Sequence, residues 1–515
     1  MPRLVHGADA LVGLVLAALI VGPAVVGGGL AGSPGAEVYG HAWVQAWAAS
    51  SWPAWPTGTN LADGAGAWAV IDPLPTWIVG GLARVVGATA AWNVWVALGV
   101  VLAAVGGGAF ARAMGGSGPV GAAGVATMPI FLGSLTSGLT EDYALGIVAL
   151  ALAALLDGRR LLGALLLGLS AWCGLYLAWL GGLAAAAIGL WRIRDRPLRW
   201  VLAGALALAV AAPATLPFRD RLAGVGHRAG TFTPRPEPLW RVNPWRGADL
   251  ASFGAPGEQN VETAFVREHP VYVGYTTVGL AALGGWHPAW LGVLACAAVA
   301  PGDNLAWAGA PTGATNPAMS AFRRLPFAER FNHHARVMLL GQLVLVGLAA
   351  RGGRRSGCWV LGFLGRGSPP QRPAGGEAPG PPAPADPGAA WVFAAALVVE
   401  TAVVSPARLP LPVAPDDSPA IYGALSALPP DLPVAVVGAA GPGIHPQRVF
   451  FDQRAHGRVL LHNPNRPVDG RPRAGSIVVA LGDAVVRVTN ERGAPTVIAQ
   501  DGAAWVVPTQ TDTPR

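Results

Sequence analysis

The stretch AAWNVWVALGVVLAAVGGGAFA, residues 90–111, contains no charged side chain and is followed at once by Arg112. A helix needs roughly 20 predominantly apolar residues to cross the hydrocarbon core of a bilayer. The stretch meets that length and predicts a transmembrane helix. Similar stretches recur along the chain, so they decide the class of fold.

The composition of the whole chain agrees with a membrane protein. Of its 515 residues, 52% are hydrophobic and 12% are charged, whereas soluble proteins carry about 25% charged residues. A single soluble core stops growing at about 250–300 residues, so the lipid bilayer is the expected partner of this much apolar sequence. The arginines are dispersed between apolar runs, and no nucleic-acid partner is expected.

Several classes of enzyme lack support in the sequence. Its three cysteines form no CxxC pair, so neither a disulfide scaffold nor a cysteine metal site is predicted, and the metal-ligand set is expected to be empty. The sequence has no HExxH, GxSxG or Walker motif, which removes the signals for a metalloprotease, a serine hydrolase and a P-loop enzyme. No cofactor is specified by any motif.

The apolar segments predict about eleven spans in total. Segment 161–191 is too long for one span and begins and ends beside arginines, so we interpret it as a tight hairpin that breaks near Cys173 and Gly174. The other predicted spans are 8–30, 90–111, 119–136, 143–156, 198–216, 271–285, 289–300, 337–350 and 390–404.

Arginines in the short connections predict the orientation, because cytoplasmic loops carry an excess of positive residues. Placing these arginines in the cytoplasm puts the N-terminus inside and the C-terminus outside, in a protein integral to a membrane, with the bacterial inner membrane as the expected location. Loops 31–75, 218–270 and 302–335 then lie outside. The arginines concerned are Arg3, Arg112, Arg159, Arg160, Arg192, Arg194, Arg196, Arg199, Arg351, Arg354 and Arg355.

The chain changes character around its last predicted span. Residues 1–364 form the polytopic domain, whereas 365–389 are rich in Pro and Gly, cannot build a core, and predict a disordered cytoplasmic linker. The last span at 390–404 is followed by residues 405–515, for which we expect a small extracytoplasmic α+β or β-rich domain.

Short β-rich runs in the C-terminal segment alternate with Gly, Pro, Asn and Asp turn signals. None is long enough to cross a bilayer and the segment has no cysteine, so the domain is expected to be disulfide-free and separable, with a helix near 421–428. The predicted strand runs are LPVAVVG (432–438), RVFFDQ (448–453), RVLLHN (458–463), SIVVALG (476–482), AVVRVTN (484–490), PTVIAQ (495–500) and AWVVPT (504–509).

The first external loop holds the most informative polar residues. Glu37 and His41 are four residues apart, and such positions share one face of a helix, so both can act on one ligand. Asp63 and Asp72 add two acids, although an acid before a proline also suits a turn or a helix cap. The loop's tryptophans fit either an interfacial belt or a platform for a sugar or lipid: Trp43, Trp47, Trp52, Trp55 and Trp68.

Two further groups are expected near the membrane on the same side. Glu141 and Asp142 begin a span, where acids stabilise a helix N-terminus, but acids at a membrane cavity are also functional candidates. An arginine–histidine group precedes the tenth span and fits either a headgroup anchor or a phosphate clamp. Its members are Arg323, Arg324, Arg330, His333, His334 and Arg336.

The order of these features resembles the GT-C-fold membrane glycosyltransferases, and more closely their uncharacterised bacterial relatives. An acid soon after the first span opens a tryptophan-rich external loop, and the apolar stretch 90–116 follows it. The resemblance covers residues 1 to about 440 as texture and order. It rests on EVYGHAWVQAW (37–47), TNLADGAG (59–66), IDPLPTW (71–77), FVREHPVYVGYTTVGLAALG (265–284), LPFAERFNHHARVMLLGQLVLVGLAARG (325–352) and IYGALSALPPDLPVAVV (421–437).

This resemblance implies a GT-C-like fold and transfer of a sugar from a polyprenyl-phosphate donor to an envelope glycan or protein acceptor on the external face. Glu37 matches by position the acid that such enzymes use as a general base. His41, Asp63, Asp72, Glu141 and Asp142 would then bind the acceptor, and Arg330, His333, His334 and Arg336 would bind the donor phosphate. A non-catalytic scaffold that binds an envelope partner, and a lipid or polysaccharide transporter, remain the alternatives.

The orientation can be tested by labelling cysteines in intact cells. In a chain freed of its own cysteines, Ser418→Cys should react with a membrane-impermeant maleimide and Ser368→Cys should not, because we expect Ser368 in the cytoplasmic linker. Labelling of the Ser368→Cys variant in intact cells would contradict the orientation.

Overall fold

The computed structural model describes most of the chain, and everything below refers to that part. The described residues are 6–53, 72–192, 196–228, 248–254, 271–308, 310–325, 328, 334–363, 387–407, 409–418, 422, 425, 432–437, 448–456, 458, 460, 477–480, 485–489, 495–500 and 503–504. Most of the predicted linker 365–389 and part of loop 31–75 lie outside these residues.

The protein is mainly helical and of membrane type. Six helical segments are long and apolar enough to cross a bilayer: Gly7–Gly27, Ala88–Ala113, Gly118–Ser137, Leu175–Arg192, Pro197–Ala214 and His334–Ser356. Three shorter apolar helices accompany them: Arg160–Cys173, Ala289–Val299 and Gly388–Val403. The membrane class is therefore supported by length and composition, while the number of eleven spans stays a prediction.

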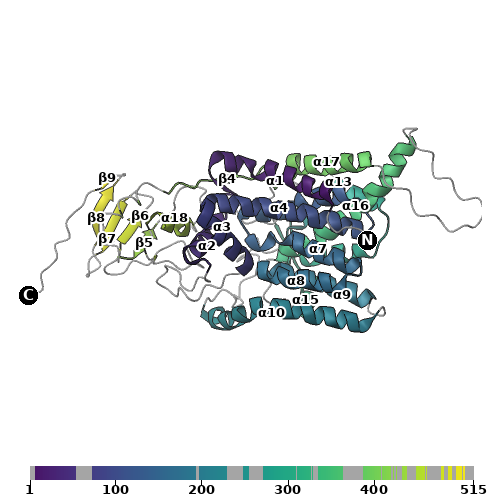
Figure 1. Cartoon of the computed structure of the whole chain (residues 1–515), viewed down its shortest axis with the longest axis horizontal. Coiled ribbons are helices and arrows are strands. Elements are labelled where there is room, and N and C mark those ends of the chain that lie inside the picture. Colours follow the sequence, from purple (N-terminus) through teal and green to yellow (C-terminus); the bar gives the residue numbers. More distant parts are fainter. Residues whose placement is uncertain are drawn as a thin grey trace, which may run out of the picture.

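The helices run side by side along the long axis of the molecule (Figure 1). They are α1 (Gly7–Gly27), α4 (Ala88–Ala113), α5 (Gly118–Ala126), α6 (Pro129–Ser137), α7 (Leu145–Leu156), α8 (Arg160–Cys173), α9 (Leu175–Arg192), α10 (Pro197–Arg228), α13 (Tyr275–Leu283), α14 (Ala289–Val299), α15 (Pro317–Phe322), α16 (Met338–Phe363) and α17 (Pro387–Val403). Two shorter helices, α2 (Val38–Ser51) and α3 (Pro73–Val86), cover the end of this bundle that faces the C-terminal sheet (Figure 1).

The outer helices present apolar side chains at their surface, which is the arrangement expected for helices in contact with lipid. Leu14 on α1 and Leu208 on α10 are exposed, as is Val392 on α17. By contrast, α5 and α6 are buried along almost their whole length, so they form the middle of the bundle.

Glycines allow α4 and α7 to approach each other closely. A Cβ atom on Gly146 of α7 would lie 2.1 Å from the carbonyl oxygen of Leu102 on α4. Likewise, a Cβ atom on Gly106 would lie 2.3 Å from the carbonyl oxygen of Gly146. Small residues commonly hold membrane helices together in this way, because van der Waals packing replaces the hydrophobic effect between helices.

Two features of the predicted spans can be compared directly with the structure. The predicted hairpin 161–191 is confirmed: α8 ends at Cys173, α9 begins at Leu175, and Gly174 separates them. Trp200 joins the two outer ends, since its ring lies 5.1 Å from the Arg160 guanidinium and its indole N–H donates to the carbonyl oxygen of Arg192.

The predicted span 119–136, in contrast, is divided into α5 and α6. Met128 between them is extended, with φ −63° and ψ 132°. It precedes Pro129, and the proline ring disfavours the helical conformation of the residue before it. The break therefore follows from the proline.

The described arginines of the short connections lie at the end of the bundle opposite the C-terminal sheet. Arg354 donates to the carbonyl oxygen of Gly115, just beyond α4, and Arg192 donates to that of Leu156 at the end of α7. Arg351, Arg354 and Arg355 belong to α16, which continues to Phe363 instead of ending at the predicted residue 350. The described arginines of the predicted cytoplasmic connections thus share one end of the molecule, whereas Arg3 and Arg194 lie outside the described residues.

The C-terminal segment forms a mixed sheet beyond the other end of the helices (Figure 1). Its strand order is β5-β6-β7-β8-β9, with β5 and β6 parallel and the others antiparallel. The strands are β5 (Val434–Val437), β6 (Ile477–Ala480), β7 (Val485–Thr489), β8 (Pro495–Gln500) and β9 (Ala503–Ala504). Four of the predicted runs are therefore strands.

One predicted strand is wrong. RVFFDQ lies in helix α18 (Arg448–His456), where Arg448 and Asp452 pair one helical turn apart at 2.8 Å. Phe450 and Phe451 are buried by packing against α2, and this tertiary contact overrides the strand-like pattern of the run. The helix expected near 421–428 falls mostly outside the described residues.

The C-terminal segment is also tied to the helices before α18 begins. Strand β4 (Val413–Ala414) pairs antiparallel with β1 (Leu30–Ala31), which directly follows α1. The domain boundary expected at 405 therefore runs close to an interface with the helical part.

The packing of α4 on α7 can be tested with one methyl group. Gly146→Ala should lower the melting temperature of the detergent-solubilised protein, because its methyl group would meet the Leu102 backbone at 2.1 Å and overpacking costs about 1–3 kcal/mol. The control is Gly182→Ala in α9, where no atom lies within 4 Å of the added methyl group. Equal melting temperatures for the two variants would contradict the close approach.

Candidate functional site

Polar residues from four parts of the chain converge at the end of the bundle near the C-terminal sheet. They come from the start of α2, the start of α3, the single turn Thr140–Asp142 between α6 and α7, and the turn His334–Val337 before α16. All four segments are helix starts or turns at the ends of helices, so their side chains meet where the helices end.

Glu37 and His41 share one face of the helix, as predicted. Glu37 immediately precedes α2, and its carboxylate Oε2 lies 3.7 Å from Nε2 of His41. The side chains are 27% exposed for Glu37 and 14% exposed for His41. These two groups reach solvent, whereas the acids next to them are buried.

The other ring nitrogen of His41 contacts a buried hydrogen-bond chain. Nδ1 lies 3.1 Å from the Thr140 hydroxyl, and that hydroxyl donates to a carboxylate oxygen of Asp72. Thr76 donates to the second Asp72 oxygen at 3.1 Å. Because Thr140 gives its proton to Asp72, it can only accept from His41, which places a proton on Nδ1. Asp72 precedes α3 as a turn residue would, but its carboxylate accepts hydrogen bonds from Thr76 and Thr140.

Glu141 and Asp142 are held by one buried cation. Arg336 donates to Glu141 at 2.9 Å, and its Nε lies 3.9 Å from Asp142, which also accepts from Ser134 at 2.8 Å. All three charged side chains are at most 5% exposed. Buried carboxylates need a paired cation, so Arg336 compensates them.

The structure shows partners for Arg336 that the sequence did not predict, and its expected role at a donor phosphate stays a prediction. It was predicted to hold a donor phosphate or to anchor the chain among headgroups, but it faces two carboxylates and lies over the Tyr176 ring at 5.4 Å. His334 is nearly buried. Asp63, Arg330 and His333 lie outside the described residues.

The electrostatic environment shifts three ionisable groups. Burial by itself would lower the pKa of His41, but its contact with the Glu37 carboxylate and the charges of Glu141 and Asp72 raise it to about 9. Burial raises the pKa of Asp72 to about 6, against the opposing charge of His41. Burial likewise raises the pKa of Asp142, with Arg336 opposing. At neutral pH His41 is therefore an imidazolium beside Glu37.

Several members of this group were missed by the sequence reasoning. None of Thr76, Ser134, Thr140 and Tyr176 was among the predicted site residues. A hydroxyl four residues after an acid, as in Asp72 and Thr76, is a pattern that local helical geometry brings together. The contact between Thr140 and Asp72 joins distant segments, and no local pattern encodes it.

A second buried ion pair lies at the opposite end of the bundle. Asp9 on α1 is fully buried and pairs with Arg112 of α4 at 2.6 Å. Gly108 and Gly118 leave room for it, since a Cβ atom at Gly108 would lie 2.5 Å from the Asp9 carboxyl carbon. The first span thus contains a paired charge that joins two helices.

The pH dependence of stability should show the shifted groups. The folded-state pKa of His41 is raised from 6.5 to about 9. Its contribution to the free energy of unfolding is therefore complete below pH 6.5 and is lost as the pH rises to 9. The pKa of Asp72 is raised from 3.8 to about 6, so its contribution to the free energy of unfolding is also greatest in acid and is lost by pH 6. Melting temperatures in detergent should therefore fall from pH 4 to pH 9.

His41→Gln should remove the decline between pH 6.5 and 9. Asp72→Asn should reduce the decline between pH 4 and 6, and Asp142 accounts for the remainder. His287→Gln is the control, because His287 lies in the connection between α13 and α14 and its pKa is lowered. A decline above pH 6.5 that persists in His41→Gln would show that another group is responsible.

Comparison with known proteins leaves the family of this chain open. No family model, curated protein or solved structure matches it. The resemblance to GT-C enzymes therefore remains a prediction from the sequence.

Proposed function

We propose that this chain is a GT-C-like membrane glycosyltransferase that transfers a sugar from a polyprenyl-phosphate donor to a cell-envelope acceptor. One observation supports it above the others: the partly exposed Glu37 carboxylate lies beside His41, and His41 is held from behind by Thr140 and Asp72. A general base must reach a bound hydroxyl and keep a fixed orientation. Glu37 meets the first need by exposure and the second by its contact with His41.

In the proposed step, an acceptor hydroxyl gives its proton to the Glu37 carboxylate as its oxygen forms a bond to the anomeric carbon of the sugar. The bond between that carbon and the phosphate oxygen breaks, and polyprenyl phosphate leaves with the electron pair. The products are the glycosylated acceptor, polyprenyl phosphate and a protonated Glu37, which returns its proton to water.

His41 lies 3.7 Å from the proposed base and takes the electrostatic role in this step. Its raised pKa keeps the imidazolium charged at neutral pH, and a cation favours both the ionised carboxylate and a departing phosphate. Arg336 is engaged with Glu141 and Asp142, so in this proposal it fixes the acids in place. Arg330 and His333 stay candidates for direct contact with the donor phosphate.

The position of the group suits a lipid-linked substrate. Glu37 and His41 lie where the apolar helices end, so a donor whose polyprenyl chain stays in the bilayer can present its headgroup there. The arginine-rich end is opposite, and the positive-inside tendency supports placing the Glu37 end on the external face, in this proposal that of a bacterial inner membrane.

The role of Glu37 can be tested with one isosteric change. Glu37→Gln keeps the shape and removes the base, and should lower the transfer rate by roughly 10²–10⁴. Transfer is measured as polyprenyl phosphate released from a panel of polyprenyl-phosphate-linked hexoses and pentoses, with purified envelope glycan as acceptor and the protein in nanodiscs.

Asp157→Asn is the matched control, because Asp157 is an exposed carboxylate beyond α7 at the opposite end of the bundle. It should transfer at the wild-type rate. A Glu37→Gln variant as active as this control would remove the catalytic assignment. Absence of release by the wild type with every donor would favour a scaffold.

A further inference from the structure

Two opposite faces of helix α2 contact different parts of the molecule. Glu37 and His41 lie on the face towards Thr140. Tyr39 is two residues after Glu37, and Trp43 is two residues after His41. Each helical residue turns the chain by about 100°, so these aromatic side chains point to the other side. That second face is covered by α18 and by residues 415–418 of the C-terminal segment.

The contact between α2 and the C-terminal segment is specific. The Tyr39 hydroxyl donates to the carbonyl oxygen of Pro415 at 3.1 Å, and the Tyr39 ring lies 5.5 Å from that of Phe451. The Trp43 indole N–H donates to Gln453 at 2.9 Å, and its ring lies 5.3 Å from that of Phe450. Tyr39 and Trp43 are both at most 3% exposed.

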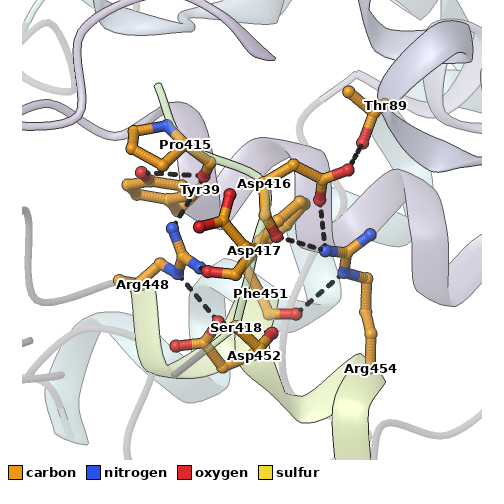
Figure 2. Close-up of polar contacts among 10 residues, drawn as sticks. All are labelled: Tyr39, Thr89, Pro415, Asp416, Asp417, Ser418, Arg448, Phe451, Asp452 and Arg454. Carbon is orange, nitrogen blue, oxygen red and sulfur yellow. Dashed lines mark hydrogen bonds and ion pairs between the residues drawn. The ribbon is translucent and has the colours of Figure 1, made fainter. Parts of the chain in front are cut away.

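Arg448 is the centre of this contact (Figure 2). Its guanidinium carbon lies 4.6 Å from the centre of the Tyr39 ring, and it donates to Asp452 at 2.8 Å and to the Pro415 carbonyl oxygen at 2.7 Å. It also donates to the carbonyl oxygen of Asp417. Arg448 is 3% exposed, and Ser418 donates to the same Asp452 oxygen at 2.9 Å. The guanidinium thus joins a ring of α2 to the backbone that precedes α18.

A second arginine of α18 offers a natural comparison. Arg454 lies over the Phe451 ring at 3.7 Å and pairs with Asp416, which accepts from Thr89 of α4 (Figure 2). The Arg454 and Asp416 side chains are both 30% exposed. These contacts lie within the C-terminal segment or, through Asp416, reach α4, so Arg454 stabilises the same segment through groups other than those of α2.

We propose that Arg448 is a positioning residue for the Glu37–His41 site: through Tyr39 it fixes α2 against the bundle, so the segment after the last helix determines where the two groups lie. The functional importance of the Glu37–His41 position rests on the proposed function. The geometric claim concerns α2 itself and holds whether or not sugar transfer occurs.

The distances explain why the site should respond to Arg448. The contact of His41 with Thr140 is 3.1 Å, and that with Glu37 is already 3.7 Å. Glu37 moves together with His41, but a displacement of α2 by about 1 Å would take the contact with Thr140 beyond hydrogen-bond length, since such bonds fade above about 3.2 Å. His41 would then move away from Asp72 and Glu141, two of the charges that favour its protonated form.

The test measures the protonation of His41 in the full-length protein in nanodiscs. Diethyl pyrocarbonate modifies a histidine only when its imidazole is neutral. Mass spectrometry of the peptide that contains His41 reports the modified fraction at each pH. The wild-type midpoint should lie near pH 9. Arg448→Gln should move it down by one pH unit or more, and Arg448→Lys, which keeps the charge but loses the planar fork, should fall between.

Arg454→Gln is the matched control and should keep the wild-type midpoint. An unchanged midpoint in a folded Arg448→Gln variant, or an equal shift in Arg454→Gln, would overturn the proposal. If Arg448→Gln does not fold, Tyr39→Leu replaces it, since that change removes the ring and leaves Arg448 paired with Asp452. Its midpoint should also fall, and an unchanged value would again overturn the proposal.

The outcome is separate from that of the transferase assay. Loss of transfer in Glu37→Gln concerns the base, whereas the His41 midpoint reports the placement of α2 without any turnover. A shifted midpoint in a protein that transfers no sugar would keep the positioning role and remove only the proposed chemistry.

Discussion

The buried pairing of Arg336 with Glu141 and Asp142 is the interaction on which the functional end of this molecule depends. It joins the start of α16 to the turn between α6 and α7, two segments almost 200 residues apart. Two carboxylates cannot remain ionised in a buried site without a cation, and removing one partner of such a pair typically costs about 3–5 kcal/mol. The same turn carries Thr140, which contacts His41 and Asp72. The orientation of His41 is therefore a consequence of charge compensation deeper in the bundle.

Much of the helical part could be predicted, because membrane helices are encoded locally by apolar length. The stretch 90–111 became α4 with ends shifted by only two residues, and Gly174 separates α8 from α9 where the hairpin was expected. Glu37 and His41 were predictable for the same reason, since a spacing of four residues fixes a shared helix face. Their partners were not, because the contacts of Thr140 with Asp72 and of Arg336 with Glu141 join residues 68 and 195 positions apart. A single sequence holds no local signal for such contacts.

The misassigned run RVFFDQ shows the same limit from the other direction. Its β-branched and aromatic residues favour a strand in isolation, yet Phe450 and Phe451 pack on α2, and the pairing of Arg448 with Asp452 suits a helix. The surface that decides between the two conformations belongs to a helix some 400 residues earlier in the chain. For this reason the segment after the last span is better regarded as part of the architecture around Glu37 than as an appendage to it.

The pairing of β1 with β4 carries a consequence for biosynthesis. Leu30 faces Ala414, so the two strands meet only after more than 380 further residues have been made. At roughly 5–20 residues per second, translation leaves the first strand without its partner for tens of seconds. During that interval α1 and α4 can already pack, but α2 has neither Pro415 nor Arg448 to rest against. The nascent chain therefore acquires its polar end last, and a ribosome that stalls before the final segment releases a membrane bundle in which that end is unfinished.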